Sequence, residues 1–180
     1  MKLERTALTG TDVRKLISVT GRGKAAARNR ALLDLLYHSG LRISEALALT
    51  RGDVQGNQIH VRHGKGDKQR TITLPLTYGH WEAWLEVCPA TEHIFATGNG
   101  SAVSRDYVRG LLARLKRKAG LSGRVHAHAF RHGHACGVFK ATGDLAAVSK
   151  NLGHSRLSVT DTYLRALTVD TSKLARVSLA

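Results

Sequence analysis

Apolar residues recur at intervals of three and four through most of this sequence, which is the spacing of helices that bury one face. Only one part of the chain alternates apolar and polar residues instead, in two short runs on either side of a glycine-rich segment that contains Lys65. Such a pattern restricts the fold to packed helices with one small sheet. We therefore predict a mainly α-helical α+β fold with a small antiparallel β-sheet.

Glycines and helix-capping residues divide the pattern into elements. We expect a short first helix with Thr11 as its N-cap, and we expect Ser39 and Gly40 to end the second helix. The expected helices after the first cover residues 25–38, 42–49, 76–86, 104–119, 131–141, 144–152 and 158–167, and the expected strands cover residues 58–62 and 70–74. A chain of 180 residues has room for one domain of ordinary size. We expect a single domain over residues 1–180, with a C-terminal tail from about residue 170.

The sequence is strongly basic, with 28 lysines and arginines against 13 aspartates and glutamates and a formal net charge of +15. This charge destabilises a compact domain by self-repulsion unless a polyanion screens it. The basic residues are spread through the apolar-periodic segments, which favours a folded cationic face over a disordered tail. Nucleic acid or an anionic membrane surface is the expected class of partner.

The two cysteines, Cys88 and Cys136, have no C-x-x-C spacing, so neither a disulfide framework nor a cysteine-based zinc module is indicated. The polar start of the chain has no apolar signal core, and no run reaches the roughly 18 apolar residues of a membrane span. These features predict a soluble, cytoplasmic protein.

Four stretches contain residue types that could carry chemistry. They are HSGLRISEALAL with Arg42 and Glu45, GKGDKQRTITLP with Lys65, HAHAFRHGHA with His128 and Arg131, and NLGHSRLSVTDTY with His154 and Tyr163. Taken alone, each residue has an ordinary alternative: a solvated arginine, a polar turn, a core histidine or a packing tyrosine. Their common order and spacing are harder to explain by coincidence.

In that order and spacing, the four stretches resemble the tyrosine recombinase family, and the resemblance covers nearly the whole chain. It implies the catalytic-domain fold of that family and strand exchange on double-stranded DNA through a covalent 3′-phosphotyrosyl intermediate. It also implies six active-site positions, which are Arg42, Lys65, His128, Arg131, His154 and Tyr163. Integration, excision and inversion are all compatible with it, and no cofactor or metal is expected.

The chemistry explains why these residue types are needed. Two guanidiniums, Arg42 and Arg131, can hold the charged non-bridging oxygens of a phosphodiester under attack. His128 is suited to take the proton of the Tyr163 nucleophile near neutral pH. By resemblance, Lys65 protonates the leaving 5′-oxygen and His154 donates to the phosphate. Glu45 is expected to orient Arg42 or an adjacent helix and not to act as a catalytic acid.

Most members of this family carry a further N-terminal helical domain, whereas this sequence begins almost directly at the catalytic domain. We expect no N-terminal core-binding domain in this sequence, either because it is a piece of a longer protein or because the protein is one of the short recombinases that resemble fimbrial phase-switch invertases and minimal integrases. A chain of that kind would rely on self-association on DNA, as a tetramer when two sites are paired.

Three alternatives remain at this point. A type IB topoisomerase shares the phosphotyrosine chemistry, and a non-catalytic DNA-binding protein could keep the fold. The histidines 126, 128, 132 and 134 could instead be metal ligands. If Tyr163 were not the nucleophile, Tyr107 and Tyr78 would be the next candidates.

Overall fold

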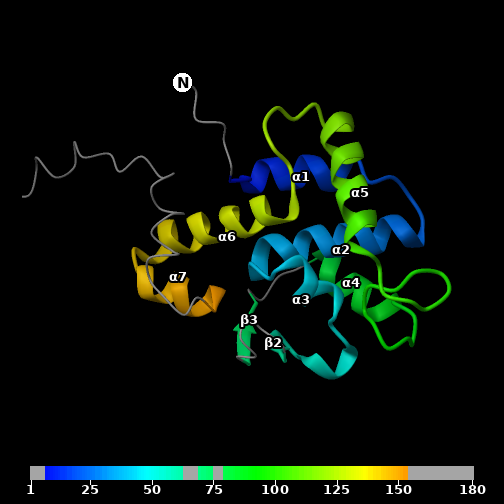
Figure 1. The fold of residues 1–180 in the computed structure, drawn as a ribbon, viewed down its shortest axis with the longest axis horizontal. Coiled ribbons are helices and arrows are strands. Elements are labelled where there is room, and N and C mark those ends of the chain that lie inside the picture. The colour runs from blue at the N-terminus through cyan, green and yellow to red at the C-terminus, as the bar shows by residue number, and fades with distance from the viewer. Residues whose placement is uncertain (1–6, 63–68, 75–78, 154–180) are drawn as a thin grey trace, which may run out of the picture.

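Figure 1 shows the computed structural model, which describes residues 7–62, 69–74 and 79–153. The elements are α1 (Gly10–Ser18), α2 (Lys24–Ser39), α3 (Ile43–Leu47), a 3₁₀ turn η1 (Arg51–Asp53), β1 (Val54–Gln55), β2 (Gln58–Val61), β3 (Arg70–Thr73), α4 (Gly79–Val87), α5 (Arg105–Lys118), α6 (Ala127–Thr142) and α7 (Leu145–Leu152). This mainly helical architecture with one small antiparallel sheet confirms the predicted fold class. The helix expected over 158–167 and the tail from about residue 170 lie outside the described residues.

Helix α2 lies at the centre of the fold, where it packs against α1, α4 and α6 (Figure 1). Residues 31–36 are consecutive and all buried, because neighbouring elements cover this helix on several sides. Gly40 ends the helix in the left-handed conformation, with a φ of 62°, and its amide donates to the carbonyl of Leu36. The predicted end at Ser39 and Gly40 is confirmed.

The sheet is antiparallel with the order β1, β2, β3. Ile59 at its centre pairs with Val54 on one side and with Ile72 on the other, and both isoleucines are buried in the main core. The two predicted strands are confirmed. Strand β1 was not predicted, because two residues are too few to display an alternating pattern.

Two predicted helix starts are wrong. The N-cap of α1 is Thr9 and not Thr11, because Thr9 forms a reciprocal capping box with Asp12, three residues further on. Helix α6 begins at Ala127, before the expected residue 131. Residues 133–136 of α6 are all buried, so no single apolar stripe marks the helix, and the expected start at residue 131 left out its first turn.

Candidate active site

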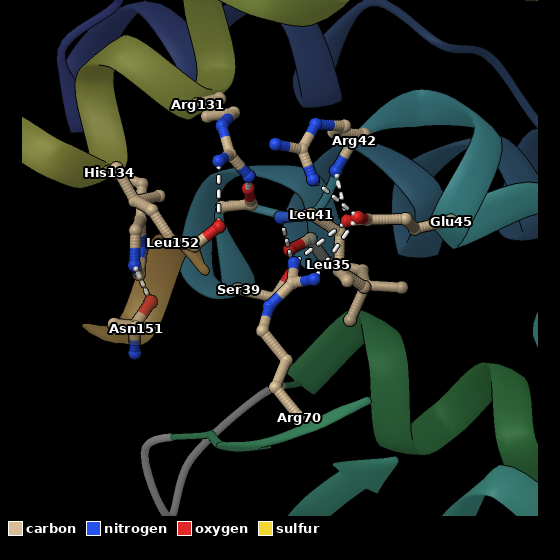
Figure 2. Close-up of polar contacts among 11 residues, drawn as sticks. Leu35, Ser39, Leu41, Arg42, Glu45, Arg70, Arg131, His134, Asn151 and Leu152 are labelled. Atoms are coloured by element: carbon tan, nitrogen blue, oxygen red, sulfur yellow. Dashed lines mark hydrogen bonds and ion pairs between the residues drawn. The ribbon is translucent and has the colours of Figure 1, made fainter. Parts of the chain in front are cut away.

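Arg131 joins the ends of two helices beneath the candidate site. Its Nη1 donates to the Gly40 carbonyl at 2.6 Å and its Nη2 to the Leu152 carbonyl at 2.8 Å (Figure 2). These carbonyls belong to the C-terminal ends of α2 and α7, where helix carbonyls lack intrahelical partners. The residue is 2% exposed. Arg131 therefore has a structural task that the sequence reasoning did not foresee.

Arg42 precedes α3 and is held by Glu45 in the first turn of that helix. The Glu45 carboxylate accepts from the Arg42 amide and from Arg42 Nη1, each at 2.8 Å. The Arg42 side chain remains 29% exposed, whereas that of Glu45 is 3% exposed. These contacts agree with the expectation that Glu45 orients Arg42.

Arg70 is a residue of this site that the sequence reasoning missed. It starts β3, and its Nη1 and Nη2 donate to the two oxygens of Glu45 at 3.1 and 2.8 Å (Figure 2). Hydrogen bonds from Arg70 and Arg42 hold the pKa of Glu45 below its usual value, although burial, the largest single influence, raises it. The sequence does contain a signal for this inward position. Arg70 lies two residues before the buried Ile72, and alternate residues of a strand share a face.

His128 lies in the first turn of α6, near both candidate arginines. Burial lowers the pKa of His128, and the positive charges of Arg131, His126 and Arg42 lower it further. At neutral pH the imidazole is therefore uncharged and can accept a proton. Because Arg42 and Arg131 both act on its pKa, the fold brings these three predicted site residues together.

The other histidines of α6 differ in their surroundings. The His132 ring lies edge-on to that of His128, with 4.7 Å between centroids, and burial together with the nearby charges lowers the pKa of His132 to about 4. His134 is buried. Its Nδ1 lies 3.0 Å from the Tyr37 carbonyl oxygen, and its Nε2 lies 2.8 Å from Asn151 Oδ1. His134 thus connects α2, α6 and α7. Across residues 7–62, 69–74 and 79–153, no cluster of three or more His, Cys, Asp or Glu side chains is arranged to hold a metal ion.

Lys65, His154 and Tyr163 lie outside the described residues, so their places in the site stay predictions. The structure describes the chain as far as Gly153, which ends α7 in a left-handed conformation immediately before His154. Of the two alternative nucleophiles, Tyr78 also lies outside the described residues. The Tyr107 hydroxyl accepts hydrogen bonds from Arg28 and Asn29, both at 3.0 Å, and so has a structural role between α2 and α5.

None of the described helices combines the length and the apolar character that a membrane crossing requires.

Comparison with known proteins adds three findings. A family model described as the phage integrase family matches residues 6–168. The chain is 35% identical over 169 residues to the tyrosine recombinase XerC of Shewanella sp. (strain W3-18-1), which covers 90% of this chain and 55% of that protein. It is 38% identical over 141 residues to XerC of Rickettsia prowazekii (strain Madrid E), with 76% of this chain and 46% of that protein covered. The chain thus spans about half the length of these curated relatives.

Solved structures give the same picture of the fold. The XerH site-specific recombinase in a post-cleavage complex with a palindromic difH substrate superimposes with a TM-score of 0.82 and 27% identity. That match covers 98% of this chain and 54% of the XerH chain. XerA recombinase superimposes with a TM-score of 0.79 at 24% identity, over 93% of this chain and 64% of that chain, which supports the fold alone.

Proposed function

This chain belongs to the phage integrase family, and from that premise we propose that it is the catalytic domain of a tyrosine recombinase, which cuts and rejoins double-stranded DNA at specific sites. The observation that carries the proposal is the grouping of Arg42, His128 and Arg131. These residues come from the start of α3 and from α6, far apart in the sequence. The buried hydrogen bond from Arg131 to the Gly40 carbonyl, two residues before Arg42, holds the two segments together. Two of the relatives are a tyrosine recombinase, XerC, and a site-specific recombinase, XerH.

In the proposed reaction, the hydroxyl oxygen of Tyr163 attacks a DNA phosphorus atom. The bond from Tyr163 to phosphorus forms as the bond from phosphorus to the 5′-oxygen breaks. His128 accepts the phenolic proton, which agrees with its lowered pKa, and Lys65 donates a proton to the departing 5′-oxygen. The products are a 3′-phosphotyrosyl bond and a free 5′-hydroxyl. A second 5′-hydroxyl can attack that ester, which reverses the proton transfers and rejoins the DNA without ATP.

Arg42 and Arg131 stabilise the charge that develops on the non-bridging oxygens, and His154 donates to the same phosphate. The two arginines differ in their partners. The neutral carbonyls of Gly40 and Leu152 accept hydrogen bonds from Arg131, while Arg42 shares the Glu45 carboxylate with Arg70. Neither the roles proposed here nor the proton transfers call for a cofactor.

Self-association on DNA is part of the proposal, as a tetramer when two sites are paired. Strand exchange needs two duplexes with two cleavage points each, and one chain supplies one nucleophile. The two buried free thiols, Cys88 and Cys136, suit a reducing cytoplasm. The +15 charge supplies the non-specific part of DNA affinity, so binding should weaken steeply as salt increases.

The test uses a duplex nicked close to the candidate cleavage point, so that the short fragment released on cleavage diffuses away and the covalent product accumulates. Wild type and Tyr163→Phe are incubated with it in EDTA and run on denaturing gels, and binding is measured for both. Wild type should form the adduct, and Tyr163→Phe should form none while binding DNA within a few-fold of wild type. An adduct on the phenylalanine variant would contradict the assignment of the nucleophile.

A supercoiled plasmid assay separates the proposal from topoisomerase activity. A recombinase needs paired recognition sites, so plasmids without them should stay supercoiled. Robust relaxation of plasmids regardless of sequence would replace the recombinase proposal with a topoisomerase.

A further inference from the structure

The carboxylate of Glu45 serves two arginines at once. It accepts four hydrogen bonds, from the amide and Nη1 of Arg42 and from Nη1 and Nη2 of Arg70. The group is almost completely buried, so water screens its charge poorly. Two guanidiniums and one carboxylate leave this trio with a single net positive charge.

The two arginines occupy different positions in the trio. The Arg70 side chain is 12% exposed, against 29% for that of Arg42. Both Nη atoms of Arg70 are bonded to Glu45, and its Nε is buried without a hydrogen-bond partner among the described residues. Arg42 instead uses one Nη and its main chain on Glu45, and no hydrogen bond to its Nε or Nη2 is found within the described part of the chain. The Nε and Nη2 atoms of Arg42 can therefore donate hydrogen bonds to a ligand, whereas the Arg70 side chain faces inward.

Arg70 also contacts the end of α7. A Cβ atom placed on Gly153 would lie only 2.8 Å from Arg70 Cδ, so the arginine stem packs directly against this turn. Gly153 immediately precedes His154, and Glu45 lies in the first turn after Arg42. A single inward arginine thus touches two segments of the candidate site.

We propose that Arg70 is a positioning residue that neutralises Glu45, so that the Arg42 guanidinium keeps its charge and its free donors for the DNA phosphate. This inference rests on the proposed function and extends it to a residue outside the six expected positions. Without Arg70, the buried carboxylate has Arg42 as its only cationic partner in the trio. Glu45 then cancels the charge of Arg42 and draws its guanidinium inward, away from the phosphate.

The first measurement is the single-turnover rate of covalent adduct formation on the nicked duplex. Arg70→Met should lower that rate roughly 10- to 100-fold, less than the loss of a donor that itself contacts the reacting atoms. Adding Glu45→Gln should raise the rate again, because the uncompensated carboxylate is removed. Arg70→Lys, which keeps a positive charge beside Glu45, should react about tenfold faster than Arg70→Met.

Arg62→Met is the matched control. Arg62 follows β2, forms an ion pair with Asp53 and is largely exposed, so the variant removes one charge and one arginine–carboxylate pair from the same sheet. Its adduct rate should stay within a few-fold of wild type. A double variant no faster than Arg70→Met, or a lysine variant equally slow, would overturn the proposal, since a purely structural defect is not repaired by a second substitution.

A readout independent of activity separates this proposal from the proposed function. Phenylglyoxal modification of arginines, followed by peptide mass spectrometry, measures how readily Arg42 reacts in the free protein. Modification of Arg42 should slow in Arg70→Met and recover in the double variant, whether or not wild type forms an adduct. An unchanged rate in Arg70→Met rejects the inference. If circular dichroism finds that Arg70→Met is unfolded, Arg70→Gln, which is neutral but keeps a hydrogen-bond donor, is measured in its place.

Discussion

Replacing Gly40 by alanine tests whether the contact of Gly40 with His134 and Leu152 is as tightly packed as the structure indicates. Gly40 has a φ of 62°, and a Cβ atom there would lie 2.5 Å from His134 Cδ2 and 2.8 Å from Leu152 Cδ2. The left-handed conformation costs alanine about 1–2 kcal/mol. Relieving overlaps of this size in a packed core costs about 1–3 kcal/mol more. Gly40→Ala should therefore lower the free energy of unfolding by about 2–5 kcal/mol.

The chain supplies a matched control for this experiment. Gly143 ends α6 with a φ of 66°, and a Cβ atom there would meet nothing within 4 Å. Gly143→Ala should carry only the conformational cost of about 1–2 kcal/mol. Urea unfolding monitored by circular dichroism at equal protein concentration measures both variants. Equal losses of stability would refute the reasoning, because they would mean that His134 and Leu152 move aside at no cost.

Three further outcomes are expected. Arg131→Lys should lose cleavage by at least about 100-fold in the nicked-duplex assay, because one ammonium cannot serve two carbonyls and a phosphate in fixed directions; near-normal cleavage would reject the assignment. Adduct formation should survive excess EDTA, and activity lost and then restored by a divalent ion would revive the metal alternative. The pKa of His132 is lowered from 6.5 to about 4, so between these pH values the unfolded chain binds a proton that the folded chain does not. The free energy of unfolding should therefore fall by at most roughly 3 kcal/mol as the pH decreases from 6.5 to about 4. Urea unfolding measured across this pH range should show a smaller fall for the His132→Gln variant.

Local pattern predicted the elements of the fold well, because helix ends and strand alternation depend on neighbouring residues. The Ser39–Gly40 helix end and the two principal strands were found in this way. The errors have local causes as well. Thr9 and Thr11 were both possible N-caps of α1, and Thr9 is the N-cap because Asp12 completes a capping box with it. In α6, burial on several sides removes the single apolar stripe by which a helix is recognised in a sequence.

The sequence named candidate site residues and the local contact between Glu45 and Arg42, but it did not indicate the contacts between distant segments. Arg131 and Gly40 are 91 residues apart in the sequence, and Arg70 and Glu45 are 25 apart. No local pattern pairs residues at such separations, because only the packing of α2, α3, α6 and β3 brings them together. Arg70 was overlooked for this reason, although its place in the strand already indicated that it faces inward.

The two arginines of the proposed phosphate clamp face one physical problem and meet it differently. A buried guanidinium needs hydrogen-bond acceptors, yet a clamp must keep its positive charge. Arg131 obtains two neutral carbonyls at helix ends, which accept hydrogen bonds without cancelling the charge. Arg42 is paired with the Glu45 carboxylate, which would cancel the charge of Arg42 if Arg42 were its only cationic partner. In the proposal made above, Arg70 supplies a second positive charge beside Glu45, so that the Arg42 guanidinium keeps its own charge for the phosphate.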